Sequence, residues 1–363
     1  MNKNPEHDAP REKKRSRAPL LVLLTLVALL GLAALIYLIV TGPFDPRLPA
    51  AESPEPTASA PAETEKPDDK PKYDAATVTP AMWKVTDAEG HTLYLFGTIH
   101  VGDERNYMAM EKIKSTLDAC DALAVEFDLK EYEGSVDMQK ETALTFLYAD
   151  GRTIKDVMQQ ELYDQIAQLL QDAGAYSKLL DRYNLPFWTT LAEQAVMMTH
   201  SDLASEFAMD SQLIDRAYEN GQKVYSVESA KLQYDLLNSM SDELCLASLR
   251  ELLDSVDTYG DDLMELYTLW LSGDEAAIRA YLAEEEELDP AYYTPEVTAM
   301  AEAFEKAMGP DRNDGMFSKI KEYLASGETV FFAVGEAHML DEHGLIELLT
   351  NAGYTVERFD YEA

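Results

Sequence analysis

The chain has 363 residues and a formal net charge of −37, because 67 Asp and Glu residues outnumber 30 Lys and Arg residues. Such acidity argues against nucleic acid and anionic lipid as partners, since the surfaces that bind them are basic. Two cysteines, Cys120 and Cys245, are too few for a disulfide scaffold, and neither has metal-ligand spacing.

The N-terminal segment predicts a membrane anchor. Residues 18–41 contain no charged side chain and follow a basic stretch, which is the pattern of a spanning helix with a cytoplasmic N-terminus. A cleaved signal peptide is the rival interpretation, but its apolar core is only about 7–15 residues long. We therefore expect a cytoplasmic tail (1–18), a signal anchor (19–41), a disordered Pro/Glu-rich tether (42–81) and an extracellular folded domain (82–363).

The folded domain shows the same order of elements at its two ends. A hairpin is expected over 82–86 and 91–96, a helix over 109–120 and a strand over 122–129. A mostly helical region follows from 152 to about 323, interrupted by a strand at 223–227. The chain then returns to a strand (328–334), a helix (344–351) and a strand through 359. This predicts an α/β fold in which two βαβ-like halves form a mixed sheet, with a large helical insertion or cap.

Two short motifs, each an apolar run followed by G-x-x-H, are the strongest functional signal. Gly97 and His100 close the first run, and Gly335 and His338 close the second. Chemistry in open α/β sheets gathers where strands end, and histidine is both a frequent metal ligand and a base near neutral pH. We expect the two histidines to share one site.

Carboxylates supply the next candidates. Glu126 lies in an apolar strand, where a buried charge needs either a cation or an arginine partner, for which Arg312 is a candidate. Asp128 shares its face of the strand, and Glu228 ends another strand. Glu228 or Asp128 could act as a general base or orient a ligand; a helix-capping Glu228 is equally consistent. Asp210 is expected to be an N-cap. We expect His200 to lie in the core and His343 to be more exposed, where it could support the site.

Four ordered blocks resemble the TraB/GumN family, which includes the Tiki proteases. They are 82–102 with the first G-x-x-H, 123–129 with Glu126, 208–233, and 311–354 with Arg312 and the second G-x-x-H. The resemblance implies a fold related to erythromycin esterase and haem-binding ChaN-like proteins. It also implies a site built from both G-x-x-H motifs and the strand glutamate. In Tiki-like members that site supports divalent-metal-dependent peptide cleavage, and some bacterial members are linked to inhibition of peptide pheromones. Glu336 and His343 depart from the family pattern.

The leading hypothesis is a membrane-anchored extracellular peptidase. His100, His338 and Glu126 would hold Mn²⁺, Co²⁺ or Zn²⁺, which would acidify a bound water that attacks a peptide or protein substrate. Gly97, Gly335, Arg312 and Asp210 would support the site. Two alternatives remain: a protein that binds a peptide or haem without turnover, and a metal-free hydrolase with histidine as general base.

Overall fold

The structure is a computed structural model that describes residues 73–283, 288–359 and 361. The predicted cytoplasmic tail, signal anchor and most of the tether lie outside these residues. In the part of the chain that is described, no helix is long and apolar enough to cross a membrane.

A mixed six-stranded sheet forms the centre of the molecule, in the order β4-β3-β5-β2-β1-β6. Strands β1 and β2 form the predicted antiparallel hairpin, and β6 adds antiparallel to β1 at the edge. Strands β2, β5, β3 and β4 are parallel neighbours. The strand bounds are β1 (Met82–Thr86), β2 (Thr92–Thr98), β3 (Ala122–Val125), β4 (Lys223–Ser226), β5 (Val330–Gly335) and β6 (Thr355–Arg358).

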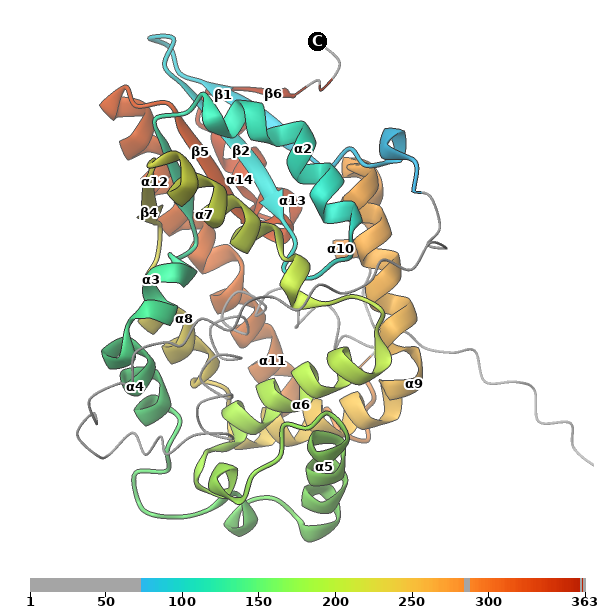
Figure 1. The fold of residues 1–363 in the computed structure, drawn as a ribbon. Coiled ribbons are helices and arrows are strands. Elements are labelled where there is room, and N and C mark those ends of the chain that lie inside the picture. The colour runs from blue at the N-terminus through green and yellow to red at the C-terminus, as the bar shows by residue number, and fades with distance from the viewer. Residues whose placement is uncertain (1–72, 284–287, 360, 362–363) are drawn as a thin grey trace, which may run out of the picture.

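The central strands are buried on both faces, as their continuous apolar sequences predict. Alternate residues of β5 belong to two separate core clusters: Phe331 lies in one and Phe332 in the other. Helices α2 (Arg105–Asp118) and α7 (Met209–Asn220) contribute to the first cluster, and α12 (Pro310–Ser326) contributes to the second. The sheet is therefore a layer between helices (Figure 1).

Apart from α7 and α12, which cover the sheet, most of the predicted helical region forms a second part of the molecule beyond the carboxyl ends of the parallel strands (Figure 1). Its longest element, α9, packs along α6. The remaining α-helices are α3 (Leu129–Gly134), α4 (Val136–Thr145), α5 (Gln160–Asp172), α6 (Leu185–His200), α8 (Ala230–Leu237), α9 (Asp242–Ser272), α10 (Glu275–Leu282), α11 (Pro295–Met308), α13 (Glu336–Leu340) and α14 (Leu345–Asn351). Short 3₁₀ turns lie at Ala75–Thr77, Ile154–Asp156, Lys178–Arg182 and Ser205–Phe207.

Three local expectations were wrong. The strand predicted to run to residue 129 ends at Val125, because Asp128 accepts the first backbone N–H groups of α3 and starts a helix there. His200 is exposed at the end of α6 rather than buried in the core. The helical region expected from residue 152 begins instead with a 3₁₀ turn at Ile154–Asp156, and its first α-helix starts at Gln160. Cys120 and Cys245 are both buried and free.

Candidate active site

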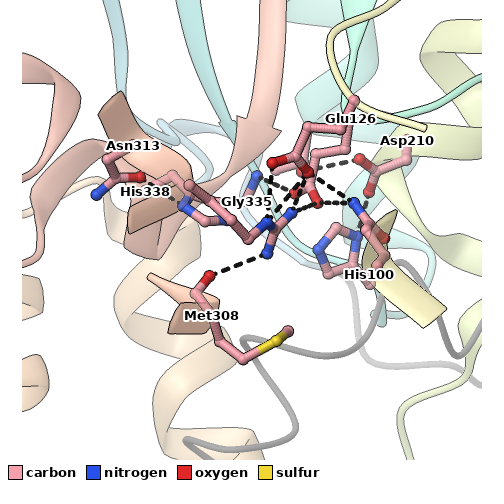
Figure 2. Close-up of polar contacts among 11 residues, drawn as sticks. His100, Glu126, Asp210, Met308, Asn313, Gly335 and His338 are labelled. Carbon is pink, nitrogen blue, oxygen red and sulfur yellow. Dashed lines mark hydrogen bonds and ion pairs between the residues drawn. The ribbon is translucent and has the colours of Figure 1, made fainter. Parts of the chain in front are cut away.

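The two histidines meet at the carboxyl ends of neighbouring strands. Strand β2 pairs with β5 in a register that places Thr98 beside Gly335, so His100 and His338 leave the sheet at the same level. A Cβ atom built on Gly335 would lie 3.4 Å from Glu126 Oε1, 3.5 Å from His100 Nε2 and 3.7 Å from His338 Cδ2. Three side chains thus converge on the Gly335 backbone, and Figure 2 draws them together.

Each histidine is held through its Nδ1 atom. His100 Nδ1 lies 2.5 Å from Asp210 Oδ2, and the other Asp210 oxygen accepts a hydrogen bond from Thr98 Oγ1 at 2.9 Å. His338 Nδ1 lies 2.6 Å from Asn313 Oδ1. Because a carboxylate or amide oxygen accepts, each Nδ1 carries the proton and a neutral ring keeps its lone pair on Nε2. Both rings are almost fully buried, so these contacts fix their orientation.

The glutamates are gathered by one guanidinium group. Arg312 Nη2 lies 2.5 Å from Glu126 Oε2 and 2.8 Å from Glu228 Oε2, and the arginine is 5% exposed. Gln233 Nε2 donates to both glutamates, at 2.8 and 3.1 Å. Glu126 Oε1 accepts from the backbone N–H of Gly335 at 3.0 Å. Arg312, considered from sequence as a partner for Glu126, lies beside it.

The environments of the three ionisable groups differ sharply. Burial favours the neutral acid, but the charges of Arg312 and both histidines outweigh it and lower the pKa of Glu126 to about 2. Burial and the Arg312 charge lower the pKa of His338 to about 3. Burial also favours neutral His100, yet the charge and hydrogen bond of Asp210 outweigh it and raise the His100 pKa. The site thus combines a neutral imidazole with a more basic one.

Two predicted residues have other contacts. Asp128 caps α3 through Lys130 N and Glu131 N and accepts from Tyr218 Oη at 2.6 Å, so its carboxylate serves a helix start. Asp210 was expected both to cap α7 and to support the site; the cap position is Ala208, and Asp210 contacts His100.

Three contributors to the site had no predicted role in the sequence analysis. Thr98 orients Asp210, Asn313 orients His338, and Gln233 joins the two glutamates. Asn313 and Gln233 lie inside the blocks that carry the family resemblance, and this was the available signal. Their hydrogen-bond partners are 25 and 107 residues away in sequence, a pairing that no local pattern encodes.

The donor atoms fit a divalent cation only in part. Two imidazoles whose Nδ1–H groups are held by oxygens are oriented as metal-ligating histidines usually are. Glu126, by contrast, has both oxygens in hydrogen bonds, one of them to a cation. Among the described residues, no three His, Cys, Asp or Glu side chains are arranged to hold a metal ion.

The structure is that of an α/β protein whose candidate active site is built on two histidines at the ends of adjacent parallel strands. Comparison with known sequences gives the family. Residues 81–358 match the TraB/PrgY/gumN family, and the chain belongs to it. It is also 24% identical over 322 residues to a protein of Amphimedon queenslandica named "Metalloprotease TIKI homolog". That alignment covers 78% of this chain and 62% of the relative, so the chain spans less than two thirds of the relative's length. No solved structure matches.

Proposed function

We propose that the protein is a divalent-metal-dependent peptidase, anchored by residues 19–41 and acting outside the cell on a peptide or protein substrate. The observation that carries the proposal is the convergence of His100, His338 and Glu126 on Gly335, with both histidines held through Nδ1. The similarity to a protein named as a metalloprotease supports it.

In this proposal, two histidines hold the ion and the residues around them keep the site in place. A bound divalent ion would supply a Lewis acid and an acidified water. His100 and His338 would hold the ion through Nε2, while Asp210 and Asn313 keep the rings in place. Arg312 holds the carboxylate of Glu126 beside them, in the ionised form at neutral pH. Glu228 also pairs with Arg312, so the arginine and the two glutamates form one network of ion pairs.

A metal and cleavage assay on the full-length chain tests this proposal. The protein is stripped with a chelator, titrated with Mn²⁺, Co²⁺ or Zn²⁺ by calorimetry, and incubated with a peptide library read by mass spectrometry. His100→Ala and His338→Ala should each weaken binding about 100-fold or more, since each removes a ligand. The double variant should lose little beyond that, because residues acting as a unit are not additive.

His200→Ala is the matched control, because that histidine is exposed on α6 and its ring bonds to the neighbouring Thr199. Far-UV circular dichroism separates lost chemistry from lost folding. Unchanged metal binding and unchanged cleavage in both single-site variants would refute the shared site.

A metal-free hydrolase is the second candidate, favoured by the His100–Asp210 pair. A buried histidine 2.5 Å from a carboxylate, with a raised pKa, has the contacts of a general base and the group that orients it. The same assay decides between the candidates. Cleavage that survives chelation but is lost in Asp210→Asn would favour the histidine base. Binding of a peptide or haem without turnover would instead identify a binding protein.

A further inference from the structure

His343 has an unusual backbone conformation close to the site. Its φ is 59°, and it is the one non-glycine residue with positive φ in the described chain. It is the third residue of a turn closed by a 2.9 Å hydrogen bond from Gly344 N to Asp341 O. Positive φ at the third position is the mark of a type II turn, which prefers Gly or Asn there. The conformation is uncommon for a residue with a side chain.

The turn is pressed against α12 and the end of α13. A Cβ atom on Gly344 would lie 2.6 Å from Met339 O, so the turn has no room to shift toward α13. His343 O accepts from Asn313 Nδ2 at 3.1 Å, and His343 Nε2 lies 3.0 Å from Asp314 Oδ1. The second contact is solvent-exposed and contributes little. The backbone carbonyl makes the more buried of the two connections, since its contact with Asn313 is partly buried.

That carbonyl decides which way the Asn313 amide points. A backbone carbonyl can only accept, so the nitrogen end of Asn313 must face His343 and the oxygen end must face His338. An amide oxygen in turn requires the His338 proton on Nδ1, which leaves the Nε2 lone pair available. Asn313 is 1% exposed, and its contact with His338 is buried.

We propose that His343 is a positioning residue for His338, acting through Asn313. The left-handed turn aims the His343 carbonyl at the Asn313 amide, and the amide sets the tautomer and ring orientation of His338. The effect on the His338 tautomer is argued from these hydrogen bonds alone. Its consequence for metal binding rests on the proposed function.

The test compares His343→Gly with His343→Val in the full-length chain labelled with ¹⁵N at histidine. Glycine adopts positive φ readily, whereas a β-branched residue resists it. The ¹⁵N signals of His338, assigned with His338→Gln, should show one tautomer protonated at Nδ1 in wild type and in His343→Gly. In His343→Val both tautomers should be present, as in Asn313→Ala. His100, which is held by Asp210, should keep its signals in every variant.

Co²⁺ titration gives an independent readout. His343→Val should bind Co²⁺ about tenfold more weakly, as expected when an orienting partner is lost, and His343→Gly should stay within about twofold of wild type. If wild type binds none of Mn²⁺, Co²⁺ and Zn²⁺, the metal proposal fails, while the NMR comparison still decides the positioning role. A single Nδ1-protonated tautomer in folded His343→Val would overturn that role. Should the valine variant not fold, His343→Ala makes the same comparison with a smaller side chain.

Discussion

Gly97, the glycine of the first G-x-x-H motif, is in direct contact with Glu336. A Cβ atom on Gly97 would overlap the Glu336 carboxylate, and the nearest backbone atom of Glu336 would lie 3.1 Å away. Glu336 is 4% exposed, and neither of its oxygens has a hydrogen-bond partner among the described residues. The motif glycine is therefore required by a side chain of the second motif.

A double-variant experiment tests this contact. Gly97→Ala should lower the free energy of unfolding by about 1–3 kcal/mol through overpacking. Gly97→Ala combined with Glu336→Ala should recover most of that loss, because the carboxylate is gone and only the nearby backbone of residue 336 remains. Urea unfolding of both variants and of Glu336→Ala alone gives the comparison. A double variant no more stable than Gly97→Ala would show that the carboxylate is not the obstacle.

Glu193, on α6, predicts a pH-dependent stability. Burial alone raises its pKa from 4.5 to about 8. As the pH rises from 4.5 to 8, the unfolded chain releases this proton while the folded chain retains it, so the free energy of unfolding falls. Each unit of pKa difference corresponds to about 1.4 kcal/mol. Glu193→Gln should match wild type below about pH 4.5 and be more stable at pH 8.

Denaturant unfolding from pH 4 to pH 9 measures this difference. Glu161→Gln, at an exposed position of α5, is the control and should change stability little at either end of the range. A constant offset between wild type and Glu193→Gln across the range would contradict a titrating carboxyl group at this position.

At the scale of elements, the crossing of α6 and α9 depends on a glycine. A Cβ on Gly260, in the middle of the 31-residue helix α9, would collide with the carbonyl oxygen of His200 at the end of α6. Glycine ordinarily weakens a helix by about 0.5–1 kcal/mol relative to alanine. Here the close approach of two backbones outweighs that cost.

Alanine substitutions at two helical glycines should therefore change stability in opposite directions. Gly260→Ala should lower the free energy of unfolding by about 1–3 kcal/mol. Gly315→Ala, in α12, should raise it by about 0.5–1 kcal/mol, since no described atom lies within 4 Å of the added Cβ. Thermal and urea unfolding of the two variants and of wild type measure whether each substitution raises or lowers the free energy of unfolding. Stabilisation by Gly260→Ala would show that the helices separate at little cost.

Strands and helices that are marked by a clear local sequence pattern could be predicted. Which of them lie side by side in the fold could not. The hairpin and the two strand–G-x-x-H units follow from apolar runs bounded by glycine, and the structure confirms them. The meeting of His100 and His338 follows from their equivalent strand ends. The insertion of β5 between β2 and β3 was not predicted. Nor was the role of Asn313, because both depend on contacts between distant parts of the chain.

At the scale of the whole molecule, the uncharged segment within residues 18–41 and the basic residues before it predict the orientation of the chain. Protease added to intact cells or spheroplasts should digest the region beyond the tether and spare the N-terminal tail. Immunoblotting of an epitope tag at each end shows which parts of the chain the protease has digested. Lysed cells, in which both ends are accessible, are the control. Protection of the C-terminal tag in intact cells would place the folded domain on the other side of the membrane.

The place of β5 in the sheet has a consequence for biosynthesis. Strands β2 and β3 each pair with β5, yet β5 begins at Val330, more than 200 residues after β3 ends. While the chain is being made, the centre of the sheet stays open until β5 has left the ribosome. Pairings of such sequence separation form late and slowly. We expect the nascent protein to lack a complete site, with His100 alone at its strand end, until β5 and His338 have been synthesised.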